Sequence, residues 1–301
     1  MISELRLRQR NAVIRAVRLF FEERDYLESD TPLRLPVLAP ELWIEPLTSG
    51  SHFLQTSPEL CMKRLVAAGN AKLFQISPCF RKGERGRLHL PEFSMLEWYR
   101  AGIDYMDLIE ECEDLVKGVI LECGGSPLFP DLAGRFPLGI SFSRLTVAEA
   151  FAQYARCSVK EALIEDCYEE VLVDEVEPNL GVGGRPTFLY DYPTALASLA
   201  RLKEEDSSVA ERFELYCDGI ELANGFSELV DPIEQRRRFE NERRAIIAAG
   251  REPGPMPEKF LAALNDMPEA AGIAMGLDRL VMVLTGAASI DEVVCFVPED
   301  L

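Results

Sequence analysis

A tight turn at Asp218-Gly219 joins two apolar segments, and it constrains the fold more than any other feature of this sequence. Asp-Gly is a favoured pair for two-residue turns between antiparallel strands, so residues 212–224 predict a β-hairpin. The turn also sets the register of the two strands. The expected cross-strand pairs are Cys217 with Ile220, Tyr216 with Glu221, and Glu214 with Ala223.

This register places Glu214 and Glu221 diagonally on one face of the hairpin, roughly 7–8 Å apart. Like charges on one face repel each other unless a cation lies between them, and a phosphate-bound Mg²⁺ is such a cation. A solvated face is the alternative interpretation. We favour the metal site because the hairpin also carries large apolar side chains, namely Phe213, Leu215, Leu222 and Phe226.

Other segments place this hairpin in a larger sheet. Two more strands, 73–80 and 92–99, lie on either side of a basic loop, and amphipathic helices alternate with the strands. Hairpins imply antiparallel pairing, so we predict an α+β fold with a mostly antiparallel sheet flanked by helices. Helices are expected at 13–21, from Ser57-Pro58 to Gly69, at 107–121, from Asp231-Pro232 to Gly250, and at 280–284.

The 301 residues are expected to form a single domain, 1–301, because a chain of this length can bury one large core. Residues of about 124–190 differ from the rest in their pattern of short, separately capped helices. Two capping boxes, Thr146…Glu149 and Ser158…Glu161, begin short helices there. We interpret this segment as an inserted helical lobe between two sheet-forming halves.

The strand 92–99 is a candidate pocket floor. At a period of two, Phe93, Met95, Glu97 and Tyr99 share one face. A carboxylate in mid-strand is costly to bury unless it meets a partner. Either this face is solvated, or Phe93 stacks on a ligand while Glu97 and Tyr99 bind an ammonium group.

Two neighbouring segments suit phosphate groups. The loop 81–87 holds four cations and is either a solvated tip or a polyphosphate clamp, for which arginine geometry is well suited. In residues 272–279, Gly272, Ala274 and Gly276 form a face with almost no side chain, and Arg279 begins a helix whose dipole favours an anion. Close helix–strand packing is the alternative, but together these signals predict a nucleoside triphosphate site.

Composition excludes several other functions. The net charge of −19 argues against nucleic acid as a partner, because binding to a polyanion depends on cations. No apolar run is long enough to cross a membrane, and the N-terminus has no signal peptide. Eight cysteines without a C-x-x-C pair, with only two histidines, argue against zinc and for a cytoplasmic protein with reduced thiols.

Several stretches resemble the class II aminoacyl-tRNA synthetases of the lysyl type. We expect no anticodon-binding domain, and in this the chain is similar to a family of stand-alone ligases that attach (R)-β-lysine to elongation factor P. The resemblance lies in motif 1 (the 13–21 helix and the strand ending at Pro32), motif 2 (from Phe80-Arg81 to Tyr99), motif 3 (Gly272 to Arg279) and the lysine-binding segments 56–60 and 219–229.

The resemblance implies a role for each matching residue. Arg81 and Arg279 are the implied catalytic residues, and Glu214 and Glu221 the implied ligands of Mg²⁺. The implied ATP-binding residues are Arg81, Lys82, Gly83, His89, Leu90, Phe93, Glu221, Leu222, Gly276 and Arg279. The implied amino-acid pocket consists of Ser57, Pro58, Glu59, Glu97, Tyr99, Asn224, Glu228 and Ala274.

The implied activity is ATP-dependent formation of a β-lysyl adenylate and transfer to a lysine of elongation factor P, by a homodimer that pairs through motif 1. Ala274, where lysyl synthetases have glycine, favours β-lysine. Gly83 replaces the motif 2 glutamate, so its contact is lost or made by Glu84, and Leu90 replaces an asparagine. Two alternatives remain: a truncated synthetase-like enzyme that activates α-lysine for another acceptor, and an inactive binding or regulatory paralogue.

Overall fold

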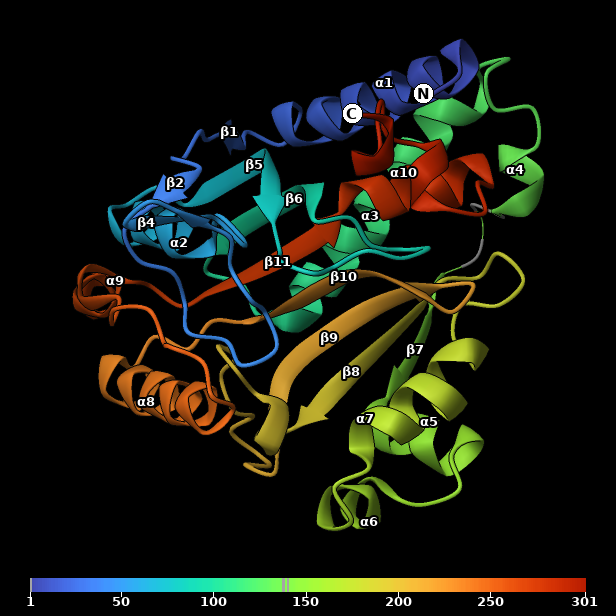
Figure 1. Ribbon diagram of the computed structural model, residues 1–301. Coiled ribbons are helices and arrows are strands. Elements are labelled where there is room, and N and C mark those ends of the chain that lie inside the picture. The colour runs from blue at the N-terminus through green and yellow to red at the C-terminus, as the bar shows by residue number, and fades with distance from the viewer. Residues whose placement is uncertain (1, 137–138, 140) are drawn as a thin grey trace.

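An eight-stranded sheet runs through the computed structural model, which describes residues 2–136, 139 and 141–301 (Figure 1). The strand order is β1-β5-β6-β11-β10-β9-β8-β7, parallel at the two edges and antiparallel between them. The predicted α+β class is confirmed. The strands are β1 (Leu27–Glu28), β5 (Lys72–Phe80), β6 (Glu92–Ala101), β7 (Ser143–Thr146), β8 (Thr187–Pro193), β9 (Val209–Cys217), β10 (Ile220–Ser227) and β11 (Ala270–Gly276).

A small sheet and the helices surround this layer. The small sheet has the order β2-β4-β3, from Arg34–Leu35, His52–Leu54 and Thr48–Ser49. The α-helices are α1 (Glu4–Glu22), α2 (Glu59–Ala67), α3 (Tyr105–Gly124), α4 (Leu132–Arg135), α5 (Val147–Tyr154), α6 (Val159–Ile164), α7 (Tyr168–Val171), α8 (Pro232–Ala248), α9 (Glu258–Ala263) and α10 (Leu277–Thr285). Shorter turns are the π-helix η1 (Leu172–Val176) and the 3-10 helices η2 (Glu177–Asn179), η3 (Thr194–Leu196), η4 (Leu264–Asp266), η5 (Ile290–Glu292) and η6 (Pro298–Asp300). Among the helices of the described residues, none is both long and apolar enough to cross a bilayer.

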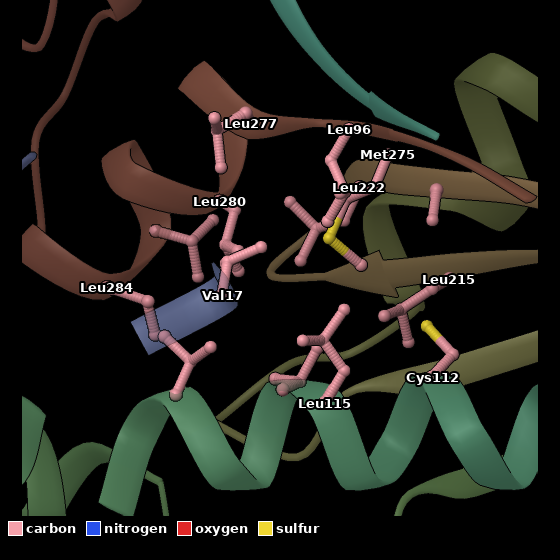
Figure 2. Close-up of a cluster of buried hydrophobic side chains, with 14 of the residues drawn as sticks. Val17, Leu96, Cys112, Leu115, Leu215, Leu222, Met275, Leu277, Leu280 and Leu284 are labelled. Atoms are coloured by element: carbon pink, nitrogen blue, oxygen red, sulfur yellow. The ribbon is translucent and has the colours of Figure 1, made fainter. Parts of the chain in front are cut away.

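The main core lies between one face of the sheet and the helices α1, α3 and α10. Figure 2 shows Val17 of α1, Leu115 of α3 and Leu280 of α10 pointing toward the apolar side chains of the strands. The N-terminal helix forms because its apolar residues recur at helical spacing, and Val13, Val17 and the two phenylalanines are buried. A second cluster, around α2, α8 and α9, covers part of the opposite face.

The helix-starting residues named in the sequence act as expected with one difference, although α1, α3 and α10 begin earlier than predicted. Both predicted capping boxes form, at Thr146 and at Ser158, and Asp231 caps α8 ahead of its proline. Ser57 was expected to cap a helix with Pro58 in its first position. Instead α2 begins at Glu59, whose N–H donates to Ser57 Oγ at 3.0 Å.

The segment of about 124–190 contributes strands as well as helices. Its helices α5 to α7 form their own apolar cluster against β8 and β9, which includes Phe151, Tyr168 and Leu189. Its strands β7 and β8 extend the main sheet at one edge. The segment is therefore attached to the sheet by backbone pairing; residues 137–138 and 140 within it lie outside the described part.

The predicted hairpin forms, but its register differs beyond the first two pairs. Cys217 pairs with Ile220 and Tyr216 with Glu221, as expected. Glu214 pairs with Asn224, and the expected pair with Ala223 is wrong because a bulge shifts the strand between Glu221 and Ala223. A bulge places two residues opposite one and resets the alternation of faces. Asn224 therefore points to the same face as Glu221.

Close packing of this hairpin makes Gly225 a test of the fold. A Cβ at Gly225 would lie 2.6 Å from Cζ of Phe213 and 2.9 Å from Cβ of Ile273. We expect Gly225→Ala to lower the free energy of unfolding by about 1–3 kcal/mol, because the neighbours must shift. Urea denaturation measures this. Gly124→Ala, whose added Cβ has no atom within 4 Å, is the control and should not destabilise the protein. Equal stability of both variants would contradict this account of the hairpin.

Candidate functional site

A cavity of about 520 Å³ lies on the sheet face opposite the main core, over β6, β11 and β10. It brings together residues that are far apart in the sequence. The predicted residues in its wall are Ser57, Glu59, Arg81, His89, Leu90, Phe93, Glu97, Tyr99, Glu221, Leu222, Asn224, Ala274, Gly276 and Arg279. Five predicted residues, all in the described part of the chain, lie outside the wall: Pro58, Lys82, Gly83, Glu214 and Glu228.

The loop after β5 brings Arg81 to this cavity. Its guanidinium carbon lies 5.2 Å from the centroid of the Phe93 ring, and Nη1 lies 3.7 Å from Oε1 of Glu84. Gly83 has a φ of +77°, which glycine adopts without strain, and the next residue, Glu84, turns into the cavity in its place. Arg81 Nε is buried with no hydrogen-bond partner among the described residues, so this guanidinium keeps a donor for an anion.

The other cations of the loop point elsewhere. Lys82 contacts the Glu45 carboxylate and lies outside the cavity wall, and its contact with ATP stays a prediction. Arg85 forms ion pairs with Asp291 at 2.9 Å and with Glu299 at 3.0 Å. Acids on the surface therefore hold Lys82 and Arg85, whereas Arg81 lines the cavity.

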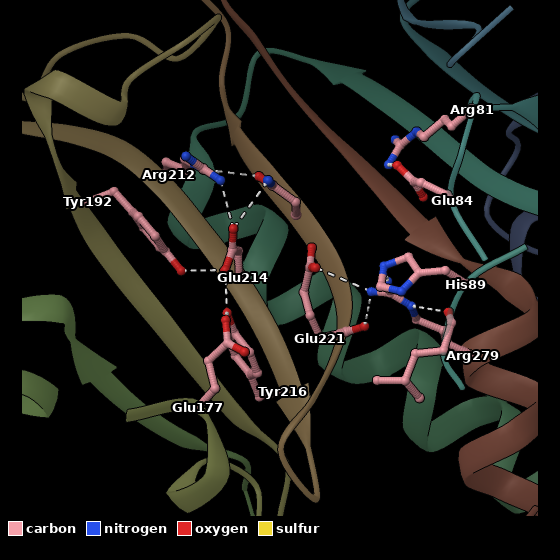
Figure 3. A network of polar contacts seen from close by, with 12 residues as sticks. Arg81, Glu84, His89, Glu177, Tyr192, Arg212, Glu214, Tyr216, Glu221 and Arg279 are labelled. Atoms are coloured by element: carbon pink, nitrogen blue, oxygen red, sulfur yellow. Dashed lines mark hydrogen bonds and ion pairs between the residues drawn. The ribbon is translucent and has the colours of Figure 1, made fainter. Parts of the chain in front are cut away.

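Arg279 lies across from Arg81 at the part of the cavity that is predicted to bind phosphate, here called the phosphate end (Figure 3). Its Nη1 donates to the Glu221 backbone carbonyl at 2.8 Å and lies 3.2 Å from a carboxylate oxygen of the same residue. Its Nη2 lies 2.6 Å from Nε2 of His89. Burial and the Arg279 charge lower the pKa of His89, which favours a neutral ring that accepts this hydrogen bond.

Glu214 lies outside the cavity wall although it shares a face with Glu221. Its carboxylate accepts hydrogen bonds from Tyr192 at 2.5 Å, Tyr216 at 2.6 Å and Arg212 at 2.7 Å, and Figure 3 shows it turned toward these groups. Within the described residues, no group of three His, Cys, Asp or Glu side chains converges as a metal site. Glu221 fits Mg²⁺, which needs few protein carboxylates when phosphates and water complete its shell; Glu214 is already occupied by its donors.

The deep end of the cavity is acidic and holds Glu97. Ser57 Oγ donates to one carboxylate oxygen at 2.7 Å, and the Tyr99 hydroxyl donates to the other at 2.5 Å. Burial, together with the neighbouring Glu59 carboxylate, raises the pKa of Glu97 to about 8. This carboxyl group therefore gains from a nearby cation, because a cation stabilises its ionised form.

A buried lysine, which the sequence reasoning missed, shares this end. Lys63 Nζ lies 2.5 Å from Glu59 and 2.5 Å from Glu228, and its side chain is 1% exposed. Against the cost of burial, these two carboxylates raise the pKa of Lys63. The spacing of Glu59 and Lys63, four residues apart on one helix, was the available signal.

Glu228 lies behind the cavity wall because of this pair, not in the wall as expected. Its other oxygen, Oε1, has no hydrogen-bond partner among the described residues. A Cβ at Gly272 would lie 2.6 Å from that oxygen and 2.2 Å from the Tyr99 ring, so only glycine fits between them. Burial raises the pKa of Glu228 to about 8. A buried acceptor thus borders the cavity floor without a donor.

The cavity wall also includes residues that the sequence analysis did not predict, and two of them are the acids Glu41 and Glu242. Neither belongs to a motif, and both reach the cavity from segments that only the folded chain brings near it. Nothing in the local sequence pattern distinguishes them from surface acids.

Comparison with known proteins gives a consistent relationship. The model of the tRNA synthetases class II (D, K and N) family matches residues 3–300. A protein of Vibrio parahaemolyticus named elongation factor P–(R)-β-lysine ligase is 39% identical, over 96% of this chain and 94% of its own. Proteins of the same name from Proteus mirabilis and Pectobacterium atrosepticum are both 38% identical, over 94% and 98% of this chain and 92% and 95% of theirs.

The match covers the chain from end to end, and it includes every segment that forms the cavity. The chain belongs to the class II tRNA synthetase family, and within it to the family of the elongation factor P–(R)-β-lysine ligases.

Proposed function

We propose that this protein is an ATP-dependent ligase that activates (R)-β-lysine as an adenylate and transfers it to a lysine side chain of elongation factor P. The observation that carries the proposal is the convergence of Arg81, Arg279 and the buried acids on one cavity. The names of the relatives support the substrates. The arginines of the cavity suit a nucleotide and its acids suit a diamino acid, the two substrates that the reaction joins.

At the phosphate end, each group has a chemical task. Arg81 holds the α-phosphate beside the Phe93 ring, which stacks on adenine. Arg279, fixed by Glu221 and by neutral His89, binds the outer phosphates. Preorganised cations of this kind stabilise charge as it develops on the phosphates, without reorganising during the reaction.

The acidic end suits a substrate with two ammonium groups. Glu97, Tyr99 and the free oxygen of Glu228 surround the terminal ammonium, and Glu59 lines the same cavity. Ala274 in the floor adds one methyl group to the pocket. A methyl group in a tight pocket changes discrimination by roughly 1–3 kcal/mol, which favours the shape of β-lysine over that of α-lysine.

The two chemical steps follow from this arrangement. The substrate carboxylate attacks the α-phosphorus, pyrophosphate leaves, and a mixed anhydride with AMP forms. The neutral amine of the acceptor lysine then attacks the carbonyl carbon, AMP leaves, and an amide forms. Mg²⁺, held by Glu221 with Glu214 behind it, would neutralise phosphate charge. Positioning and electrostatics contribute most of the rate enhancement.

Two further properties belong to the proposal. We infer a homodimer through the motif 1 region, where Leu7, Leu27 and Leu33 are 46%, 60% and 37% exposed, and sedimentation at micromolar concentration tests it. We also place the protein in the cytoplasm, because its protein substrate is a translation factor.

The direct test uses the pure protein with ATP, (R)-β-lysine and elongation factor P from the same organism. Mass spectrometry should show one β-lysyl group added to the factor. Charging of tRNA with α-lysine instead would favour the synthetase-like alternative. No substrate-dependent exchange of pyrophosphate into ATP would indicate a binding or regulatory paralogue.

Arg81 and Arg85 form a matched pair for the phosphate end. We expect Arg81→Ala to lower the rate of pyrophosphate exchange at least about a hundredfold, because it removes a preorganised cation from the reacting phosphate. Arg85→Ala removes the same charge from the same loop but only breaks surface ion pairs. Its rate should stay within about twofold of the parent, and equal losses in both variants would contradict the assignment.

The raised pKa values predict how binding depends on pH. In the free protein, the pKa values of Glu97 and Glu228 are about 8. A bound ammonium group lowers them, so binding of (R)-β-lysine releases protons below pH 8. Its affinity should therefore rise between pH 6 and pH 8, by up to about tenfold per pH unit for each proton released. Calorimetry in two buffers of different ionisation enthalpy measures this release. Proton uptake, or an affinity that does not change over this range, would contradict the prediction.

A further inference from the structure

A carboxylate with no assigned role lines the cavity near the phosphate end. Glu41 is partly buried in the wall, in contact with the same space as Ser57 and Glu59. Among the hydrogen bonds and ion pairs of the described residues, none involves the carboxylate of Glu41. The neighbouring acids differ in this respect, since Glu59 pairs with Lys63 and Glu97 accepts from Ser57 and Tyr99.

The position of Glu41 is fixed from both sides. It belongs to residues 36–47, the crossing loop, which runs from the small sheet toward α8 (Figure 1). On one side, the Leu42 N–H donates to Glu242 of α8 at 2.9 Å, and Arg251 reaches the Leu42 carbonyl. On the other side, the Lys82 N–H donates to the Glu45 carbonyl at 2.8 Å. The loop is thus tied across the cavity.

Glu41 shares the cavity wall with Glu59 and Arg81, so the charges of both groups act on it. Burial and the Glu59 carboxylate raise the pKa of Glu41 to about 7, with Glu242 acting in the same direction. Arg81 and, more weakly, Lys63 act against them. Acids and the Arg81 guanidinium thus act on Glu41 from within the wall that they share. Because acids outnumber cations around Glu41, a further positive charge would be stabilised there.

We propose that Glu41 is a substrate-binding residue that holds the amino group nearest the carboxyl end of the diamino-acid substrate. This inference rests on the proposed function. The substrate carboxylate must lie at Arg81 to react, so the amino group one or two carbons away lies between Arg81 and Glu59. An ammonium group has three donors, and Glu41 supplies an acceptor from the crossing loop, a different segment from α2 with its Glu59.

The test compares two ligands in Glu41→Gln and in the parent protein. (R)-β-Lysine carries the amino group in question, whereas 6-aminohexanoate keeps the carboxylate and the terminal ammonium but lacks that group. Loss of a charge-assisted hydrogen bond should weaken (R)-β-lysine about tenfold or more, in both Kd by calorimetry and KM in pyrophosphate exchange. The Kd of 6-aminohexanoate and the KM for ATP should change less than twofold.

Glu45→Gln is the matched control, because it removes a carboxylate from the same loop outside the cavity wall. Its Kd for (R)-β-lysine should equal that of the parent. An unchanged Kd in Glu41→Gln, or an equal loss for both ligands, would overturn the assignment. If the parent protein shows no pyrophosphate exchange, the proposed function is overturned. If Glu41→Gln still loses affinity for (R)-β-lysine alone, the role of Glu41 remains supported.

Discussion

The ammonium group of Lys63, buried between Glu59 and Glu228, is the interaction on which the site depends. One contact of 2.5 Å joins Lys63 to Glu59 within α2, and another of 2.5 Å joins it to Glu228, the residue that follows β10. Removal of one partner from a buried ion pair leaves an uncompensated charge and costs about 3–5 kcal/mol. The pair also settles which carboxylate oxygens remain for a ligand, because it engages one oxygen of Glu228 and leaves the other without a donor at the cavity floor.

The rest of the site repeats this pattern of partial compensation. Protein donors satisfy Glu214, while the acids in the cavity wall outnumber the cations there among the described residues. An excess of carboxylates favours cationic ligands. The raised pKa values of Glu41, Glu97 and Glu228 reflect the same excess of buried acidic groups. The arginines at the other end provide the complementary charge for phosphate, so one sheet face holds both halves of the chemistry.

Much of this was predictable because its causes are local. Alternation along β6 correctly placed Phe93, Glu97 and Tyr99 on one face, and Asp218-Gly219 correctly set the turn. Prediction was incomplete where a distant group decided the outcome. Glu45 holds Lys82 away from the cavity, and a bulge moves Asn224 to the face of Glu221. Glu41 and Glu242 were missed because only the folded chain brings their segments to the cavity, and the full pairing of Lys63 was missed because Glu228 lies on a distant segment.

The sequence by itself determined the class of fold, the order of the motifs and the types of side chain available for phosphate and ammonium groups. Backbone periodicity and turn chemistry act over a few residues, so these features can be derived from the chain alone. Only the tertiary structure decided which charges compensate each other. Pairing depends on distances across strands and loops, and burial strengthens each interaction by excluding water. That competition left Glu41 and one oxygen of Glu228 unpartnered among the described residues, while it occupied Glu214 and Lys82.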